Sequence, residues 1–516
     1  MKTIVEPQRE VPVLAETEVI VVGGGPAGIG AALASARTGA QTILIDRFGN
    51  LGGLQTQGNN SIFAFVDPGL HGGIVMEILD RLVKAGASRS EENVPTAEQA
   101  IRRMPFMNGK SPDQLPKRLL ETSVGYWGRW GRTFDGEYYK CMLDQMMAEA
   151  GVNLLYHTLA AGAIREGDSL KGVIVETKEG RQAILGKVVI DVTGTGDIAW
   201  RSGAPVLGDE GFPVGPRKGH PGGMLDAFYM NGVDLAKFRE FRKANPVEWG
   251  GMYGGRKIIG EAQAKGSDIK SGSVILSPEW DFYGTGKVYC MNPVHAVPLD
   301  RTGWMAKEMT DCEIDLRKQA LAMHQLLKEK VPGFENSYIE KLPQSPTLIG
   351  HRIVGEHVMT VSEMREGKVF EDSVAINNMP PDIYEATGRF RYEIVPHDVP
   401  YRALLSKGID NLMAAGTTMS SGAFAMAGLR YCTPSICTGQ AAGTAAALAA
   451  QNNVSPKKLD VAKLQEALRR QGVRVSVEDV PADVLEPYQF IQQLGLCFER
   501  TPGAQLDVTE EEIGCY

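Results

Sequence analysis

Three features that often reveal a protein's compartment or partner are missing from this sequence: a long apolar run, a long basic run and a paired-cysteine motif. No apolar stretch approaches the roughly 18 residues of a membrane-spanning helix, so we expect no membrane span. The first 18 residues, MKTIVEPQREVPVLAETE, are charged and lack the apolar core of a secretory leader. The seven cysteines include no C-x-x-C pair, which favours reduced thiols and predicts a cytoplasmic protein.

An excess of positive charge is also missing. The 516-residue chain has a net charge of −8 and a pI of about 5.7. Nucleic acids and anionic membranes attract basic surfaces, so we expect neither as a partner. The hydrophobic fraction of 43% is ordinary for a globular protein, and the length allows two or three domains.

Glycine, in contrast, is abundant, and its 60 residues fall in clusters. The first cluster lies in residues 18–46, EVIVVGGGPAGIGAALASARTGAQTILID, where Gly23, Gly25 and Gly28 have G-x-G-x-x-G spacing between a strand pattern and a helix-forming stretch. In a dinucleotide-binding βαβ unit, such glycines permit a tight turn, close approach of backbone to a pyrophosphate, and close helix–strand packing. Asp46 ends the next strand pattern and can accept hydrogen bonds from a ribose. The order of strand, glycines, helix, strand and acid predicts a dinucleotide site rather than a purely structural βαβ unit.

Two further glycine-rich stretches extend this prediction. Residues 47–59, RFGNLGGLQTQGN, hold the pair Gly52–Gly53, which gives the ribityl chain of a flavin bare backbone to lie against and which an NAD site does not need. Residues 193–197, TGTGD, end a buried strand pattern and place more bare backbone at the carboxyl edge of a sheet, where α/β proteins bind ligands. An ordinary turn is the alternative for each stretch taken alone.

The rest of the chain suggests a nucleotide-binding domain that is interrupted by a second domain. Residues 203–223 hold 7 Gly and 4 Pro and predict a crossing between domains, and no second strand–G-x-G-x-x-G–helix unit follows. We therefore expect four parts: residues 16–215 with an insertion at about 60–135, a substrate or cap domain at 216–384, a closing part at 385–452, and a helical tail at 453–516.

Six segments between residues 18 and 450 carry a resemblance to a known family. They are VVGGGPAGIGAALASARTGAQTILIDR, LGGLQTQG, VVIDVTGTGDIA, HRIVGEHVMT, VPYRALLSKGIDNLMAAG and LRYCTPSICTGQAAGTAAALA. With them the sequence resembles the FAD-dependent oxidoreductase family and, more distantly, the flavoprotein subunits of fumarate reductase and succinate dehydrogenase. The resemblance implies an α/β fold: a Rossmann-like, glutathione-reductase-type FAD-binding domain assembled from both ends of the chain, with an inserted α+β substrate domain.

The same resemblance implies which residues hold FAD. The implied contacts are Gly23, Gly25, Pro26, Ala27 and Gly28 for the pyrophosphate, Asp46, Arg47, Gly194 and Asp197 for the adenosine half, and Gly52, Gly53, Leu54 and Gly416 for the ribityl chain and centre. The chain departs from the pyridine-nucleotide disulfide reductases at Thr417, where those proteins carry an acid. A ribityl contact at this position is therefore left open.

Residues 419–450 are almost all small, with the single charge Arg430 in their middle. Thr433 and Pro434 predict a helix that begins with a hydroxyl cap followed by proline and runs over residues 434–449. The positive end of this helix would present the backbone N–H groups of Ser435 and Ile436 to the N1–C2=O edge of a reduced flavin. A helix that only packs is the alternative.

Four residues are candidates for contact with substrate: His351, Arg352, His397 and Arg430. In the fumarate reductase pattern an arginine at the place of Arg430 clamps a substrate carboxylate, and a surface ion pair is the competing interpretation. Arg352 would orient substrate, and a histidine would exchange a proton. His295 is a further candidate. Any one of these histidines can instead be structural, but we expect at least one of them in the site.

The predicted activity is hydride transfer between N5 of FAD and a small polar organic substrate, such as an alcohol, amine, sugar or hydroxy acid. No metal is expected. The electron acceptor is open between oxygen, a quinone and a partner protein, and the oligomeric state is open too, a homo-oligomer included. Three alternatives remain: an NAD-dependent dehydrogenase, a flavoprotein with net non-redox chemistry (an isomerase or lyase), and a tRNA-modifying flavoprotein, which the acidic balance disfavours.

Overall fold

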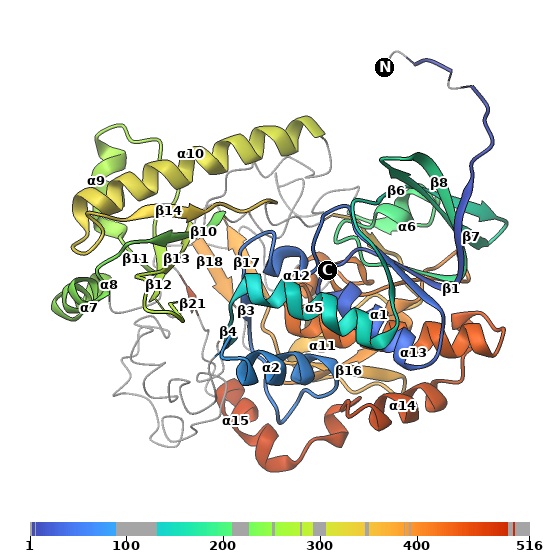
Figure 1. The fold of residues 1–516 in the computed structure, drawn as a ribbon. Helices are drawn as coiled ribbons and strands as arrows, with labels where there is room; N and C mark the ends of the chain where they lie inside the picture. Colours follow the sequence, from blue (N-terminus) through green and yellow to red (C-terminus); the bar gives the residue numbers. More distant parts are fainter. Residues whose placement is uncertain are drawn as a thin grey trace.

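A computed structural model describes residues 3–5, 7–88, 132–208, 226–249, 253–278, 281–292, 306–345, 350–385, 388–391, 394–493 and 499–500. Two sheets dominate it: a seven-stranded sheet in the body of the molecule and a five-stranded sheet beside the body (Figure 1). Within the described residues, no helix is both long enough and apolar enough to cross a membrane.

The seven-stranded sheet is built around β1 (Val13–Val22), whose last four residues are buried. β1 runs parallel to β2 (Thr42–Ile45) on one side and to β8 (Gly180–Asp191) on the other. β20 (Leu412–Ala414) pairs in parallel with β8, so the sheet takes strands from distant parts of the chain. The other strands are β5 (Asn153–Leu155), β6 (Leu159–Glu166) and β7 (Ser169–Thr177). The expected α/β class is confirmed.

Two helices rich in small residues, α1 (Pro26–Arg37) and α13 (Cys432–Gln451), pack against one face of this sheet. Their backbones touch. A Cβ added to Gly439 would come within 2.1 Å of the Ala27 carbonyl oxygen, and a Cβ added to Gly443 would come within 2.1 Å of the Ala31 carbonyl oxygen. Glycine alone leaves this space free. The small residues of α13 therefore hold the late part of the chain against the first helix.

The remaining elements of the body surround this core. On the other face of β1, Ile20 and Val22 share a buried cluster with Val173 and Val175 of β7 and with residues of the short α6 (Asp197–Arg201). Further helices lie outside α1 and α13: α2 (Ile74–Lys84), α5 (Gly136–Ala150), α14 (Val461–Arg470) and α15 (Ala482–Gln493). The tail helices α14 and α15 run along the lower edge of the molecule in Figure 1. Of the insertion expected at residues 60–135, the stretch 89–131 lies outside the described residues.

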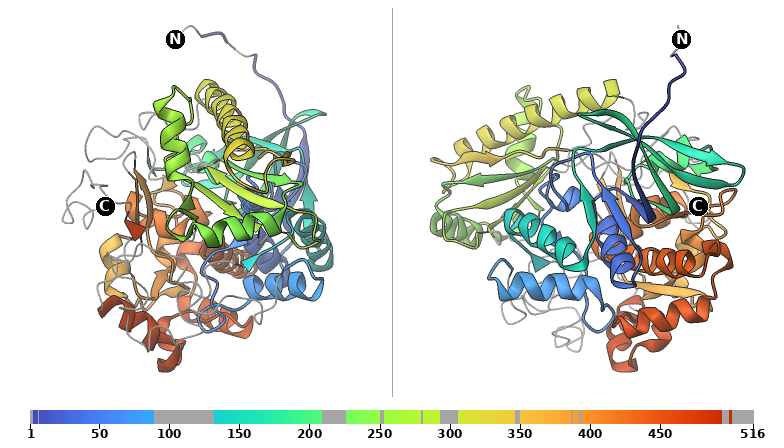
Figure 2. Two further views of the ribbon diagram at one scale, coloured as in Figure 1. Left: turned by 90° about the vertical axis from the view of Figure 1, so that its left-hand side faces the viewer. Right: turned by 45° about the vertical axis from the view of Figure 1, so that its right-hand side comes forward.

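The five-stranded sheet has a core of its own. Its antiparallel strands are β11 (Tyr253–Gly254), β12 (Val274–Ser277), β13 (Val288–Asn292), β10 (Asp226–Asn231) and β14 (Tyr338–Lys341), in that order. The long helix α10 (Ala306–Lys330) lies along this sheet (Figure 2) and contributes Met323 and Leu327 to the same buried cluster as Phe228. Two shorter helices complete this unit, α7 (Leu235–Ala244) and α9 (Arg256–Ala264).

Asn59 joins the five-stranded sheet to the body. Its side-chain Nδ2 donates a hydrogen bond to the Ala227 carbonyl at 3.1 Å, and the Tyr229 hydroxyl donates to the Asn59 carbonyl at 3.2 Å. Asn59 is fully buried and has a φ of 55°, a conformation that asparagine tolerates better than most residues. The loop after β2 is thereby fixed between the two sheets.

Candidate cofactor and substrate site

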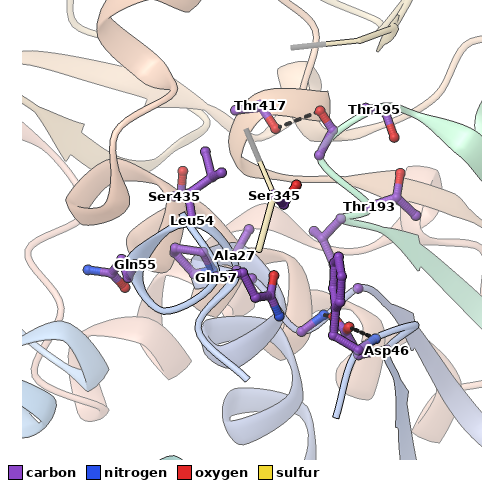
Figure 3. A pocket seen from close by; sticks show the side chains of 18 of the residues that line it. Ala27, Asp46, Leu54, Gln55, Gln57, Thr193, Thr195, Ser345, Thr417 and Ser435 are labelled. Carbon is purple, nitrogen blue, oxygen red and sulfur yellow. Dashed lines mark hydrogen bonds between the residues drawn. The ribbon is translucent and has the colours of Figure 1, made fainter. Parts of the chain in front are cut away.

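One cleft lies at the carboxyl ends of β1, β2 and β8 and contains about 1420 Å³ of space, part of it open to solvent. Widely separated parts of the chain contribute to its walls, which are lined by residues 22–27, 45–48, 53–55, 57, 60, 62, 64, 158–160, 192–195, 197, 345, 415, 417, 430–432 and 435. In Figure 3, Asp46 and Gln55 lie at opposite ends of the labelled side chains, with Ala27 and Gln57 between them. The cleft is elongated, as a dinucleotide requires.

The first glycine loop forms the floor of the cleft. Gly23 has a φ of 115°, and a Cβ there would meet the Val192 carbonyl oxygen at 2.4 Å. Gly25 is the N-cap of α1, and Pro26 and Ala27 are the first residues of the helix. Because glycine has no side chain, it provides no side-chain acceptor for the first N–H groups of the helix. Such a helix end binds phosphate through its free N–H groups and the positive end of its dipole. Gly23, Gly25, Pro26 and Ala27 all line the cleft as expected.

The second glycine pair lies directly beside the first loop. The Gly52 N–H donates to the Gly24 carbonyl at 2.9 Å, and a Cβ on Gly53 would come within 2.8 Å of the Gly25 Cα. The two bare backbones therefore form one cradle, which side chains would fill. Gly53 and Leu54 line the cleft, whereas Gly52, with a φ of 107°, shapes the turn behind them.

Asp46 occupies one end of the cleft and is already tied to the backbone. Its Oδ2 accepts from the Gly24 N–H at 2.6 Å, and its Oδ1 accepts from the Phe48 N–H at 2.7 Å. Burial raises the pKa of this carboxyl, although the two N–H bonds oppose the shift. A carboxylate oxygen has more than one lone pair, so a ribose hydroxyl can still bind here. Arg47 is exposed at the same end, with its guanidinium 4.8 Å from the centre of the Phe48 ring.

Three residues at this end were not expected from the sequence: Thr158, Leu159 and Ala160, at the start of β6. They join Asp46 because the Thr158 N–H donates to the Asp46 carbonyl at 2.9 Å. No glycine or charge marks them in the sequence, so composition gives no signal for their role.

The middle of the cleft combines two distant turns. Gly194 has a φ of 81°, and its carbonyl accepts from the Thr417 hydroxyl at 3.3 Å (Figure 3). Asp197 lines the cleft at the start of α6, where its carboxylate accepts from the Thr195 hydroxyl at 2.9 Å. This hydrogen bond joins the turn after β8 to the turn after β20.

Four residues expected to touch the cofactor lie behind the lining instead. A Cβ on Gly28 would meet the Gly23 carbonyl oxygen at 1.8 Å, so Gly28 permits the close packing of α1. Gly416 has a φ of 62° and its N–H donates to the Thr438 hydroxyl at 3.1 Å. Ile436 is fully buried, and its carbonyl oxygen packs 2.3 Å from the position of a Cβ on Gly30. The fourth residue is Gly52, which shapes the turn behind Gly53 and Leu54.

The start of α13 differs from the sequence-based expectation. The helix begins at Cys432, with Tyr431 as its N-cap, and Thr433 lies inside it with its hydroxyl donating to the Ala64 carbonyl at 2.9 Å. The N–H of Ser435 donates to the Tyr431 carbonyl at 3.0 Å and is therefore used within the helix. The N–H groups without an intrahelical acceptor belong to Cys432 and Thr433, three residues earlier than the expected Ser435 and Ile436. Ser435 still lines the cleft.

The other end of the cleft holds Arg430, Tyr431 and Cys432. The Arg430 guanidinium lies over the Tyr431 ring, 4.9 Å from its centre, in cation–π geometry. The Cys432 thiol donates to the Ile62 carbonyl at 3.0 Å, and burial raises its pKa to about 11. Gln55 lies at the end of the labelled side chains opposite Asp46 (Figure 3), and the neutral polar residues Gln57, Asn60 and Ser345 also line the cleft. Of the four predicted catalytic residues, only Arg430 lines the cleft.

The two described histidine candidates lie elsewhere. The His397 ring is fully buried. Its Nδ1 lies 3.0 Å from the Val395 carbonyl oxygen, and its Nε2 lies 3.3 Å from the Asn377 side-chain amide nitrogen. Burial lowers its pKa to about 4. The His351 ring stacks on Trp200, with ring centres 5.7 Å apart. His295 lies outside the described residues. Neither described ring lines the cleft, so a catalytic histidine stays a prediction.

Arg352 is buried outside the cleft lining, on the short strand β15 (Arg352–Ile353). Its Nε donates to the Ser421 carbonyl at 2.9 Å, and burial lowers its pKa to about 10. The prediction that Arg352 orients substrate therefore requires a contact outside the cofactor cleft.

Comparison with known proteins places these features in a family context. A family model described as FAD dependent oxidoreductase matches residues 18–468. The tRNA uridine 5-carboxymethylaminomethyl modification enzymes MnmG of Bacillus licheniformis and Bacillus subtilis are each 27% identical over 225 residues, which is 43% of this chain and 30% of those proteins. The chain thus matches less than a third of the length of these relatives. Among solved structures, a geranylgeranyl bacteriochlorophyll reductase-like protein from Thermoplasma acidophilum is 13% identical, with 93% of this chain and 98% of that chain covered and a TM-score of 0.42.

Proposed function

The chain belongs to the FAD dependent oxidoreductase family, and from this premise we propose that it transfers hydride between a small polar organic substrate and N5 of FAD. FAD supplies the acceptor or donor for the hydride when it is bound. The substrate classes that we favour are alcohols, amines, sugars and hydroxy acids, because the cleft ends in an arginine and several neutral polar side chains.

The observation that carries the proposal is the cradle formed by Gly23, Gly25 and Gly53 in the same cleft as Arg430. In this proposal the glycines and the start of α1 bind the pyrophosphate, and Asp46 binds the adenosine ribose. The hydroxyls of Thr417 and Ser435 are available along the middle of the cleft. We also propose that this arrangement is of the glutathione-reductase type, with the residues between about 216 and 384 as the substrate domain.

At the substrate end, we assign orientation to Arg430 and proton exchange to the Tyr431 hydroxyl. Arg430 offers a planar set of donors that suits a carboxylate or several hydroxyl oxygens. Tyr431 is beside it, and its phenolic hydroxyl can both donate and accept a proton in a hydrogen bond. The Cys432 thiol, with its raised pKa, remains protonated near neutral pH and is not assigned a step.

An anaerobic screen tests the proposal. The FAD-loaded protein is mixed without oxygen with alcohols, amines, sugars and hydroxy acids, and the visible absorbance of the flavin is followed. Lasting bleaching by one class supports hydride transfer and identifies the substrate class. Turnover of a substrate without lasting bleaching supports the alternative of net non-redox chemistry. Oxygen, a quinone and a carrier protein are then added separately to find which of them restores the absorbance.

The partial match to tRNA-modifying enzymes suggests one alternative activity. It covers less than half of this chain, and the net charge of −8 disfavours binding to a polyanion. Measurement of tRNA binding at physiological salt decides between the two: tight binding would favour RNA modification over a small-molecule substrate.

A further inference from the structure

Arg352 carries a buried positive charge without a counter-ion in the part of the chain that the structure describes. Its side chain is 7% exposed, and its Nε donates to the Ser421 carbonyl. A guanidinium has five N–H groups, and this bond uses one. The Nη1 and Nη2 groups make no hydrogen bond or ion pair with any described residue, which leaves most of the donor capacity of Arg352 unused.

This arrangement is unfavourable unless something else compensates it. Removal of an ion from water is unfavourable even after the protein relaxes, and a single neutral carbonyl does not offset that cost. The lowered pKa of Arg352 has the same cause, since burial disfavours the charged form. A residue with only a structural role would be more stable here as an apolar side chain of similar length.

Ser421 supplies a second unused donor at the same place. Its side chain is fully buried, and its Oγ has no hydrogen-bond partner among the described residues. The carbonyl of the same residue is the acceptor for Arg352 Nε, so the hydroxyl and the guanidinium belong to one small region. A hydroxyl and a cation that both lack an acceptor are complementary to an anion with more than one oxygen.

The region adjoins the cofactor cleft through both of its segments. The N–H of His351, next to Arg352, donates to the carbonyl of Thr195, and Thr195 lines the cleft. On the other segment, Thr417 lines the cleft four residues before Ser421. The region is therefore tied to the part of the cleft wall that holds Thr195 and Thr417.

We propose that Arg352 and Ser421 form an anion pocket beside the cofactor cleft, and that it takes a carboxylate group of the substrate. This inference rests on the proposed function, because it narrows the polar substrate to an organic acid. Arg352 holds the carboxylate through Nη1 and Nη2, and the Ser421 hydroxyl donates to it. The bound group neutralises the guanidinium, which removes the cost of burying it unpaired.

Thermal unfolding of the FAD-loaded protein with acetate as the probe tests the pocket. Acetamide serves as the neutral isostere, and chloride at equal ionic strength serves as the simple anion. We expect acetate to raise the Tm in a concentration-dependent way, and acetamide and chloride to have no comparable effect. Arg352→Met should have a higher Tm than the wild type without acetate, because the unpaired buried charge is gone, and should show no response to acetate. Ser421→Ala should weaken acetate binding by up to about tenfold, as expected for one lost hydrogen bond to a charged group.

Three results would overturn the proposal. Arg352→Met with a lowered Tm and an undiminished response to acetate would make Arg352 a structural residue. A response that survives in Arg352→Met but disappears in Arg430→Gln would place the carboxylate at Arg430 in the cleft. Equal responses to chloride and acetate would identify a site for simple anions. These binding results are independent of turnover, so they can be read even if no compound in the anaerobic screen reduces FAD.

Discussion

Gly439 of α13 lies against Ala27 of α1 so closely that a Cβ on Gly439 would come within 2.1 Å of the Ala27 carbonyl oxygen. Ala27 begins the helix whose first turn borders the cleft, and Gly439 belongs to the helix that carries Ser435 and Cys432 to the same cleft. The contact therefore fixes the two halves of the cofactor site relative to each other.

Substitution of Gly439 by alanine should destabilise the protein even though alanine favours helices. The added methyl group collides with backbone, which cannot move aside, and overpacking of this kind costs about 1–3 kcal/mol. Chemical denaturation measures the loss, and the FAD content after purification should fall with it. Gly260→Ala in α9 is the matched control, because no atom lies within 4 Å of its added Cβ. That control should gain about 0.5–1 kcal/mol. Equal effects of the two substitutions would contradict the close packing of α1 and α13.

Substitution of Gly25 by alanine should separate cofactor binding from folding. Gly25 has a φ of −73°, and the nearest atom to its added Cβ is 3.9 Å away, so the ligand-free protein accepts alanine within about 0.5 kcal/mol. The methyl group enters the cradle at the start of α1, so we expect the affinity for FAD to fall at least about tenfold. Titration of the apoprotein with FAD gives the affinity, and Gly272→Ala, which meets no atom within 4 Å, is the control. Unchanged FAD affinity in Gly25→Ala would place the pyrophosphate elsewhere.

Stability should fall as the pH drops from about 6.5 towards 4, in part because of His397. Burial lowers the pKa of this histidine from 6.5 to about 4, so the unfolded chain binds a proton in this window and the folded protein does not. The folded protein therefore favours the neutral form of His397. This preference contributes on the order of 3 kcal/mol to the free energy of unfolding, fully present above the pKa of the unfolded chain and lost as the pH falls to the pKa of the folded protein. Denaturation at several pH values measures the slope, and His397→Gln should flatten it. A slope that is unchanged in this variant would contradict a buried neutral histidine, and would favour a catalytic role with access to solvent.

Arg430→Gln should raise KM for the true substrate by about tenfold to a hundredfold, the range for one lost charge-assisted hydrogen bond or pair of bonds. The FAD spectrum and the melting temperature should change little, because Arg430 is only partly buried at the edge of the cleft. Arg430→Lys keeps the charge without the planar donor set and should recover only part of the loss. A lowered kcat with unchanged KM in Arg430→Gln would point to a role in chemistry rather than in binding.

The local parts of this account follow from the sequence. Gly23, Gly25 and Gly28 occur in a fixed order with a strand, a helix and Asp46, and each spacing reflects backbone geometry within about 30 residues. Such short-range geometry is encoded in neighbouring residues. The structure accordingly places Gly23 and Gly25 in the cleft and Gly28 in the packing behind it.

The parts that the sequence did not predict depend on distant contacts. Helix α13 begins at Cys432 rather than at the predicted Pro434. The Thr433 hydroxyl does not cap the helix, because it donates a hydrogen bond to the Ala64 carbonyl, 369 residues away in the chain. The burial of His397 and Arg352 depends on which strands and turns enclose them, and no local pattern records that. Thr158 lies in the cleft beside Asp46, whose carbonyl, 112 residues earlier in the chain, accepts a hydrogen bond from the Thr158 N–H.

The central claim is that a substrate C–H bond delivers hydride to FAD in this cleft. Its most direct test is anaerobic single turnover with the true substrate deuterated at the reacting carbon, followed through the visible absorbance of the flavin. The account predicts lasting bleaching, one reduced FAD for each substrate oxidised, at a rate that deuterium slows. Conversion of substrate while the flavin stays oxidised throughout would contradict it.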